Sequence, residues 1–371
     1  MKNDQQFMQQ AIDLAWQGLY STSPNPRVGC VIVQQGAVIA QGYHIRAGEG
    51  HAEVNALAEC DEAKGATAYV SLEPCSHTGK TPPCCETLIN AGIARVVVAM
   101  QDPNPQVAGN GIKRLRAAGL QVDVGVLEEK ARELNPGFIQ RMESGRPYVT
   151  VKLAMSLDGR TAMASGESQW ITGEQARSDV QRLRARSCAI VSGVATVMLD
   201  NALLTVRAEQ LGLDDPLKSL AIERQPLRVI LDSSLSLSPS AAILSQPGKT
   251  LVVAVKEDVV RERALQAAGA EVIYVDADNS RVNLRQVMTL LAQKHCNEVL
   301  VEAGATLAGA FWSQALVDKL TVYMAPTLLG SQARALMDLP LQRMEQQQRL
   351  CIESICAVGS DWRIDAHPVV A

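Results

Sequence analysis

The chain has 371 residues, of which 47% are hydrophobic and 20% are charged, and its net charge is −4. This composition is typical of a globular protein with roughly two or three domains, and the acidic balance disfavours a nucleic-acid partner, whose phosphates attract a basic surface. No apolar run approaches the ~18 residues that a membrane helix needs, and the N-terminus lacks the apolar core of a signal peptide. We therefore expect a cytoplasmic protein with no membrane partner, whose nine cysteines are free thiols or metal ligands.

The first 145 residues alternate between helical and extended patterns. Residues 5–19 carry apolar side chains at helical spacing, and residues 28–33 and 37–44 predict a hairpin with Gly36 in its turn. The segments that follow are strands at 66–72, 95–100 and 121–126, and helices from about His51 and at 85–92, 111–119 and 127–142. This alternation predicts a three-layer α/β domain.

Residues 142–148, MESGRPY, mark the expected domain boundary, because Gly145 and Pro147 interrupt any regular element. The predicted domains are therefore residues 1–145 and residues 146–371. The second half restarts with an extended run and continues with β-rich runs at 189–194, 227–232, 250–255, 271–276, 298–304 and 319–326. Helical segments such as 173–186 and 284–295 separate these runs, which predicts a second α/β domain with a mostly parallel sheet.

A histidine, a glutamate and two cysteines in the first domain suit a metal site. A catalytic zinc ion takes three protein ligands and leaves its fourth position to water, and His51, Cys75 and Cys84 can supply the three. Zinc lowers the pKa of its bound water toward ~7, and Glu53 is the carboxylate that can take and return protons. Side chains at i and i+2 of a regular helix point apart, so His51 and Glu53 can share a site only at the very start of a helix, which Gly50 suits.

H-x-E followed by P-C and a further cysteine is the signature of zinc nucleobase deaminases, in which the glutamate shuttles protons. Residues 76–83 separate the two cysteines here, whereas the usual spacing is C-x-x-C. This departure leaves Cys85 and His77 as alternatives for the third ligand, with Cys84 preferred. A fourth ligand from either alternative would close the ion into a structural site, and a buried histidine beside unrelated thiols is the alternative without metal.

The stretches TSPNPRVGCVIV, HAEVNAL, LEPCSHTGKTPPC and AMQDPNPQVAGNG occur in this order. Together they resemble the deaminase half of the bifunctional riboflavin-biosynthesis deaminase–reductases, a family marked by a long loop between the two cysteines. The resemblance implies a cytidine-deaminase-like domain that uses Zn²⁺ to remove the 2-amino group of 2,5-diamino-6-ribosylamino-pyrimidinone 5′-phosphate, with Glu53 protonating ring nitrogen and departing ammonia. It also implies substrate contacts by Asn25, His44, Lys80, Asp102 and Asn104.

The second half contains neither G-x-G-x-x-G nor a Walker motif, so a standard dinucleotide-binding fold is unsupported. Residues 301–311, VEAGATLAGAF, run from a buried strand through a glycine-bordered turn into a helix, whose N-terminus can hold a pyrophosphate. KLAMSLDGRTA, GESQWIT, VATVMLDNALLTVR and LDSS precede it, and the set resembles the reductase half of the same family. The resemblance implies a dihydrofolate-reductase-like domain in which NADPH reduces the opened ribose to a ribityl chain.

The resemblance to the reductase half also implies two sets of contacts. The cofactor contacts are Ala154, Trp170, Thr196, Asp200, Ser233, Gly304, Ala305, Thr306, Leu307, Ala308, Gly309 and Ala310. The substrate contacts are Ser168, Arg184, Leu204, Arg207 and Glu302. Arg184 and Arg207 can hold a 5′-phosphate through forked hydrogen bonds, and Lys152 and Asp200 are candidates for orienting the sugar C1 and its proton.

Several of these residues also have a purely structural interpretation. Arg184 lies in an amphipathic helix and could face solvent, Trp170 could belong to a core, and Gly309 could be a packing contact. Ala202 stands where the family usually carries a proline. We predict a two-step enzyme acting on a small-molecule ribotide, with a homodimer as a plausible assembly. The alternative is a zinc deaminase of another pyrimidine joined to an unrelated nucleotide-binding domain.

Overall fold

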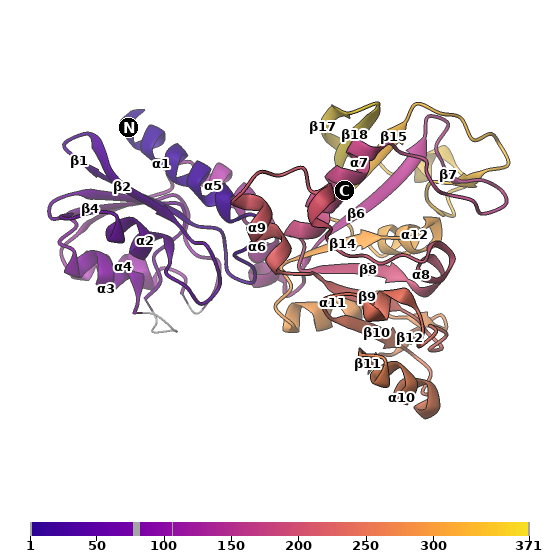
Figure 1. Cartoon of the computed structure of the whole chain (residues 1–371). Helices are drawn as coiled ribbons and strands as arrows, with labels where there is room; N and C mark the ends of the chain where they lie inside the picture. The colour runs from indigo at the N-terminus through magenta and orange to yellow at the C-terminus, as the bar shows by residue number, and fades with distance from the viewer. Residues whose placement is uncertain (1, 77–81, 106, 370–371) are drawn as a thin grey trace. The chain divides into compact units, whose positions relative to one another are not determined.

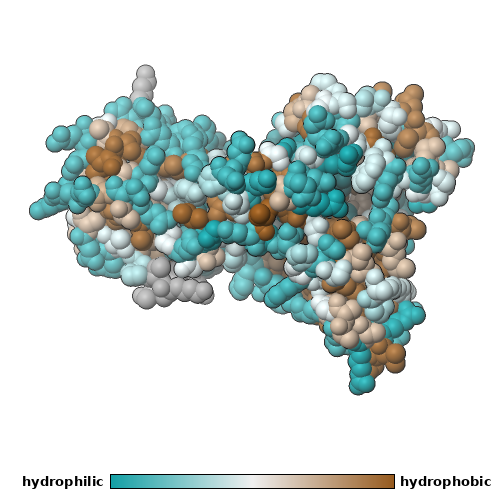
Figure 2. Space-filling model, viewed as in Figure 1, coloured by the Kyte–Doolittle hydropathy of each residue, from teal (hydrophilic) through white to brown (hydrophobic). Residues whose placement is uncertain are grey.

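The computed structural model describes residues 2–76, 82–105 and 107–369. Contacts within the chain divide it into two compact units, Met1–Arg146 and Pro147–Ala371 (Figure 1). Within the described ranges, no helix is long and apolar enough to cross a membrane. Figure 2 shows hydrophilic and hydrophobic residues interspersed over the visible face, as is usual because much of any protein surface is apolar.

The N-terminal unit is built on a five-stranded sheet of order β2-β1-β3-β4-β5. Strand β1 pairs antiparallel with β2 and with β3, whereas β3, β4 and β5 are parallel. The strands are β1 (Gly29–Gln34), β2 (Ala37–Tyr43), β3 (Thr67–Val70), β4 (Arg95–Val98) and β5 (Gln121–Val124). The helices are α1 (Lys2–Ala15), α2 (Ala52–Ala58), α3 (Cys84–Asn90), α4 (Asn110–Ala117), α5 (Glu128–Leu134) and α6 (Pro136–Ser144).

Helices cover both faces of this sheet because successive strand residues point to opposite sides. On β1, Cys30 and Ile32 belong to the core shared with α2, α3 and α4. Val31 and Val33, which alternate with them, belong to the core shared with α1, α5 and α6. The predicted three-layer α/β domain is confirmed.

The C-terminal unit is built on a nine-stranded sheet of order β11-β10-β9-β8-β14-β6-β15-β18-β17. Its strands are β6 (Tyr148–Ser156), β8 (Ala189–Gly193), β9 (Leu227–Leu231), β10 (Thr250–Ala254), β11 (Ala270–Tyr274), β14 (Glu298–Glu302), β15 (Lys319–Ala325), β17 (Leu350–Val358) and β18 (Asp361–Pro368). Neighbouring strands are parallel from β11 to β15, and the last two strands pair antiparallel. The mostly parallel sheet that the sequence predicts is therefore present.

Two apolar cores lie on the two faces of this sheet. On β14, Val299 and Val301 join the core with α11 and α12, and Leu300 joins the core with α7 on the other face. The helices are α7 (Glu174–Arg186), α8 (Val194–Asp200), α9 (Leu217–Glu223), α10 (Val259–Ala267), α11 (Leu284–Gln293) and α12 (Ala305–Ser313). Short strands complete the unit: β7 (Arg160–Ala162), β12 (Ala277–Asp278), β13 (Arg281–Val282) and β16 (Arg334–Ala335).

Candidate metal centre and candidate cofactor cavity

One edge of the N-terminal sheet gathers residues that are distant in the sequence. Because β3 and β4 are parallel, their carboxyl ends meet at this edge, and these strands lead to Cys75 and to residues 102–104. Because β1 runs antiparallel to both of its neighbours, its start lies at the same edge, together with the end of β2. Asn25 precedes β1 and His44 follows β2. The topology therefore brings these predicted site residues to one edge.

His51, Cys75 and Cys84 form a cluster whose three ligand atoms all lie within 4.8 Å of one another. His51 Nδ1 lies 3.2 Å from Cys84 Sγ and 3.6 Å from Cys75 Sγ. A tetrahedral zinc ion, with bonds of about 2.1 Å to nitrogen and 2.3 Å to sulfur, separates such ligand atoms by about 3.6 Å. The donor set and its spacing therefore fit a zinc ion.

Helix starts place the ligands and the carboxylate in one site. Helix α2 begins at Ala52, so His51 is the extended residue that precedes it, and Glu53 lies in its first turn. Helix α3 likewise begins at Cys84. Glu53 is buried, and burial is the main cause that raises the pKa of its carboxyl group above the ordinary value. A raised pKa makes the carboxylate of Glu53 a stronger base, which suits a group that accepts and returns a proton.

The side chains of Cys75 and Cys84 share a hydrogen bond. A hydrogen bond from the Cys84 thiol is the main cause that lowers the pKa of Cys75 to about 4, and a hydrogen bond from His51 acts in the same direction. The backbone N–H of Cys84 also donates to Cys75 Sγ, at 3.3 Å. These hydrogen bonds favour the thiolate of Cys75, the form in which cysteine binds metals.

Cys85, the alternative ligand, points away from this cluster. Its Sγ donates to the carbonyl oxygens of Pro74, at 3.3 Å, and Gly111, at 3.6 Å. The side chain packs in the core with α4. This geometry favours Cys84 over Cys85 as the third ligand, and it removes Cys85 as a fourth ligand. The other alternative, His77, and the predicted phosphate contact Lys80 lie outside the described residues.

Asn25 and His44 form a hydrogen-bonded pair beside the cluster. Asn25 Nδ2 lies 3.1 Å from His44 Nε2, and His44 Nδ1 lies 3.0 Å from the carbonyl oxygen of Gly50. An amide nitrogen can only donate, so Nε2 accepts and Nδ1 donates to Gly50, which defines a neutral tautomer. Burial lowers the pKa of His44 and favours this neutral form. The ring also stands edge-on to His51, with centroids 5.2 Å apart.

The other two predicted deaminase contacts lie in the segment that follows β4. Asp102 is buried, and its Oδ1 accepts the backbone N–H of Asn104 at 2.8 Å. This short bond fixes the turn between the two residues. Asp102 therefore orients the segment as well as offering a carboxylate at the edge of the sheet.

The C-terminal unit contains a cavity of about 1130 Å³, large enough for a dinucleotide and a second small molecule. Its wall includes the carboxyl ends of β8, β9 and β14, where ligands bind in open α/β sheets. Of the residues that the sequence predicts for this site, the wall contains Lys152, Ala154, Ser168, Trp170, Arg184, Thr196, Asp200, Leu204, Arg207, Ser233, Glu302, Gly304, Ala305, Thr306, Leu307 and Ala310.

Ala308 and Gly309 are not part of this wall, so their prediction as cofactor contacts is corrected. Ala308 is fully buried in the core beneath α12. A Cβ atom on Gly309 would lie 2.0 Å from the carbonyl oxygen of Asp338. Gly309 is therefore a packing contact, and this close approach explains why the position is a glycine. The helix turns these two positions away from the cavity, because only part of a helix circumference can face one side.

Arg184 faces neither solvent nor an open phosphate position. Its Nε donates to Glu302 Oε1 at 2.6 Å and its Nη2 to Glu302 Oε2 at 3.0 Å, while Nη1 donates to the carbonyl oxygen of Thr205. The side chain of Arg184 is 13% exposed. The forked donors expected to hold a phosphate thus bind a carboxylate in this structure, and the alternative of a solvent-facing arginine is wrong. Arg184 and Glu302 both line the cavity, so their contact with the substrate stays a prediction.

Arg207 is one of five arginines on the cavity wall, and no carboxylate among the described residues neutralises its charge. Its backbone N–H bonds Gln181, and its Nη1 reaches only the neutral Gln210 Oε1, at 3.5 Å. Among the described residues, no carboxylate forms an ion pair with it. An arginine without a carboxylate partner on a cavity wall suits an anionic group such as a phosphate.

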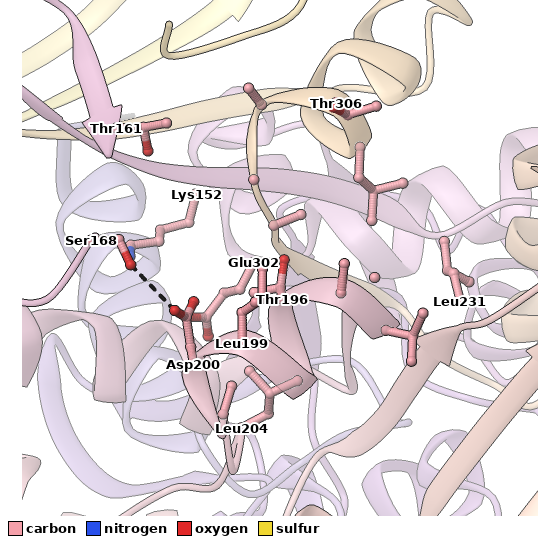
Figure 3. A pocket seen from close by; sticks show the side chains of 18 of the residues that line it. Lys152, Thr161, Ser168, Thr196, Leu199, Asp200, Leu204, Leu231, Glu302 and Thr306 are labelled. Carbon is pink, nitrogen blue, oxygen red and sulfur yellow. Dashed lines mark hydrogen bonds between the residues drawn. The ribbon is translucent and has the colours of Figure 1, made fainter. Parts of the chain in front are cut away.

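Lys152, Ser168, Asp200 and Glu302 point into the same part of the cavity (Figure 3). Ser168 Oγ donates to Asp200 Oδ1 at 3.2 Å. Lys152 has no hydrogen-bond partner among the described residues, and its Nζ lies 5.9 Å from the ring centroid of Tyr323. Burial lowers the pKa of Lys152, although the Glu302 carboxylate opposes this shift. A lysine with a lowered pKa can release a proton more readily than an exposed one.

Trp170 is 70% exposed, so it is not a core residue. The guanidinium of Arg177 stacks 4.7 Å from its ring centroid. Arg177 and Gln181 are wall residues that the motifs missed. They lie with Arg184 at helical spacing on α7, so the 3.6-residue period was the signal that could have identified them.

Two family models match separate parts of the chain. Residues 147–364 match the family described as the RibD C-terminal domain, and residues 1–100 match the cytidine and deoxycytidylate deaminase zinc-binding region. The chain is 49% identical to the riboflavin biosynthesis protein RibD of Escherichia coli, over 96% of this chain and 97% of that protein. It is 45% identical to the RibD of Haemophilus influenzae, over 98% and 96% respectively.

Solved structures give the same result. A structure of Acinetobacter baumannii RibD has a TM-score of 0.92 and 45% identity, and the match covers 100% of this chain and 99% of that one. A Thermotoga maritima structure, described as a diaminohydroxyphosphoribosylaminopyrimidine deaminase/5-amino-6-(5-phosphoribosylamino)uracil reductase, has a TM-score of 0.85 and 31% identity, with 99% of both chains covered.

Proposed function

The chain belongs to the RibD family of bifunctional riboflavin-biosynthesis enzymes, and from this premise we propose which of its residues carry the two reactions. It is a deaminase and a reductase that uses Zn²⁺ and NADPH. We assign deamination of the diaminopyrimidine ribotide to residues 1–145 and reduction of its ribosyl group to residues 146–371. The observation that supports the first assignment best is the His51, Cys75 and Cys84 cluster beside the buried Glu53.

In the deaminase site, His51 Nδ1 and the sulfurs of Cys75 and Cys84 would hold the zinc ion. When bound there, zinc supplies a water molecule that ionises near neutral pH. Glu53 takes one proton from the attacking water and transfers it to the pyrimidine ring nitrogen. It then takes the remaining hydroxyl proton and gives it to the amine, which departs as ammonia while the ring carbonyl forms. Asn25 binds the pyrimidine edge with its amide, held in place by the neutral His44.

In the reductase site, the cavity wall would bind NADPH, which supplies the hydride. Arg207 binds the 5′-phosphate of the ribotide, since its guanidinium lacks a carboxylate partner among the described residues. Asp200, fixed by Ser168, orients the opened sugar. Lys152 donates the proton that accompanies hydride transfer to C1. The Arg184–Glu302 ion pair supports this end of the cavity and is not a phosphate site.

The partner is a small-molecule substrate, and we propose a cytoplasmic homodimer. Ile352 and Ile355 on the edge strand β17 are 56% and 54% exposed, and Trp362 on β18 is 45% exposed. The register places all three on one face of the sheet. An exposed apolar patch of this kind marks a protein–protein contact, and a second copy of the chain offers the same patch. Ile352→Lys with Ile355→Lys should give a monomer by analytical ultracentrifugation, whereas Ser354→Lys on the polar face should not.

The deciding experiment supplies the diaminopyrimidine ribotide with NADPH and follows ammonia and NADPH absorbance together. Glu53→Gln should retain zinc and lose ~10²–10⁴-fold in deamination, the contribution of one proton-transfer group. Reduction of the already deaminated intermediate should continue in this variant. Conversely, Asp200→Asn should slow NADPH oxidation while ammonia release continues. Undiminished deamination by Glu53→Gln would remove Glu53 from the proposed role.

A further inference from the structure

Glu73 is a buried carboxylate with no part in the chemistry described above, and it lies two residues before Cys75. Its Oε1 accepts the backbone N–H groups of Gly111, at 2.9 Å, and Ile112, at 3.2 Å. Its Oε2 accepts those of Asp102, at 3.1 Å, and Gly109, at 2.9 Å. One side chain therefore bonds four backbone donors, two in the segment that connects β4 to α4 and two in the first turn of α4.

These four hydrogen bonds explain why the carboxylate of Glu73 can be buried at this position. An unpaired carboxylate is very costly to bury, whereas one that accepts several N–H groups is satisfied. The first N–H groups of α4 have no partner within the helix, and the positive end of the helix favours a negative charge. The backbone of Glu73 adds a further link, because its N–H donates to the carbonyl oxygen of Met100 at 3.0 Å.

The same region is joined to the metal ligands by close packing. A Cβ atom on Gly111 would lie 2.0 Å from the carbonyl oxygen of Pro74, so α4 approaches the Pro74–Cys75 peptide as closely as glycine allows. Cys85 Sγ donates to the carbonyl oxygens of both Pro74 and Gly111. The start of α4, the Cys75 segment and the start of α3 thus form one rigid contact.

We propose that Glu73 is a positioning residue for deamination, which holds Asp102 and Asn104 at a fixed place relative to the zinc ligand Cys75. This inference rests on the proposed function, in which Asp102 and Asn104 contact the substrate. Glutamine at this position would present an amide group to two of the four N–H donors, leaving that pair without an acceptor. The segment would then shift while the zinc ligands stay in place.

The test compares Glu73→Gln with Glu86→Gln. Glu86 also joins α3 to α4, through Arg114 at 2.6 Å and 2.9 Å, but it lies on the surface. For Glu73→Gln we expect kcat/KM of deamination to fall about 10–100-fold, mainly through KM, because small misplacements of binding groups have effects of this size. Zinc content should stay at one ion per chain, and NADPH oxidation with the deaminated intermediate should be unchanged. Glu86→Gln should resemble the unmodified protein in all three measurements.

Two further variants separate positioning from general structural damage. Glu73→Asp keeps the charge and should lose less deamination than Glu73→Gln. Asn104→Ala should raise KM alone, and its combination with Glu73→Gln should be less than multiplicative, because both changes act on one substrate contact. Equal activity of the Glu73 and Glu86 variants, loss of zinc or of reduction in Glu73→Gln, or strictly multiplicative effects would overturn the inference. A silent Asn104→Ala would instead show that the proposed substrate contact is wrong.

Discussion

The metal centre and the cofactor cavity differ in whether their reactive groups contact one another. In the N-terminal unit the reactive groups are in contact with one another: His51 Nδ1 lies 3.2 Å from Cys84 Sγ, and Cys75 accepts bonds from both. In the C-terminal unit, Lys152 and Arg207 line a cavity of about 1130 Å³, and neither has a carboxylate hydrogen-bond partner among the described residues. A site for a small ion can be closed by its own ligands, whereas a site for a dinucleotide must leave its charges available for the ligand.

The largest effect is expected when each of the two adjacent cysteines, Cys84 and Cys85, is replaced in turn. Cys84→Ala should lose zinc and more than ~10⁴-fold of deamination, because the ion supplies the ionised water. Cys85→Ala should keep both, since the partners of Cys85 Sγ among the described residues are backbone carbonyls. Metal analysis and ammonia release measure the two effects, with NADPH oxidation as the internal control. Retention of zinc by Cys84→Ala but not by Cys85→Ala would reverse the ligand assignment.

The next largest effect should come from Lys152 on the cavity wall. Lys152→Met should slow NADPH oxidation ~10²–10⁴-fold without affecting ammonia release. Burial lowers the pKa of Lys152 below the ordinary 10.5, so the protonated donor is lost at a correspondingly lower pH. The rate of reduction should therefore fall as pH rises through this lowered pKa, and the alkaline fall should be absent in Lys152→Arg, which stays charged. An unchanged pH profile in that variant would exclude Lys152 as the proton donor.

Arg207 and Arg184, two of the arginines on the cavity wall, provide the smallest and most selective test. Arg207→Gln should raise KM for the phosphorylated substrate about 10–100-fold, the value of one charged hydrogen bond of ~1.5–3 kcal/mol. Arg184→Gln should instead lower the free energy of unfolding of this unit by ~3–5 kcal/mol, because it leaves the buried Glu302 carboxylate unpaired. Steady-state kinetics and thermal unfolding distinguish the two outcomes. A raised KM in Arg184→Gln but not in Arg207→Gln would assign the phosphate contact to Arg184 instead.

Local patterns predicted much of the architecture and chemistry of this protein. Alternating hydrophobic periods predicted two α/β domains, because side-chain burial follows the periods of strands and helices directly. The short spacing of His51 and Glu53 predicted a helix start, and α2 begins at Ala52 as that argument requires. The chemistry of the metal centre could also be predicted, since H-x-E followed by P-C and a further cysteine is the signature of zinc nucleobase deaminases.

Long-range contacts decided the remainder. Which of two adjacent cysteines faces His51 depends on how α3 packs against α4, and this rotation leaves no mark in the local sequence. Arg184 is separated from Glu302 by more than a hundred residues, and parallel strands bring them together. Glu73 likewise finds its four donors only after β3 and β4 pair. A sequence records which groups are present along the chain, but sheet register and helix rotation determine which of them meet, because those depend on the packing of the whole unit.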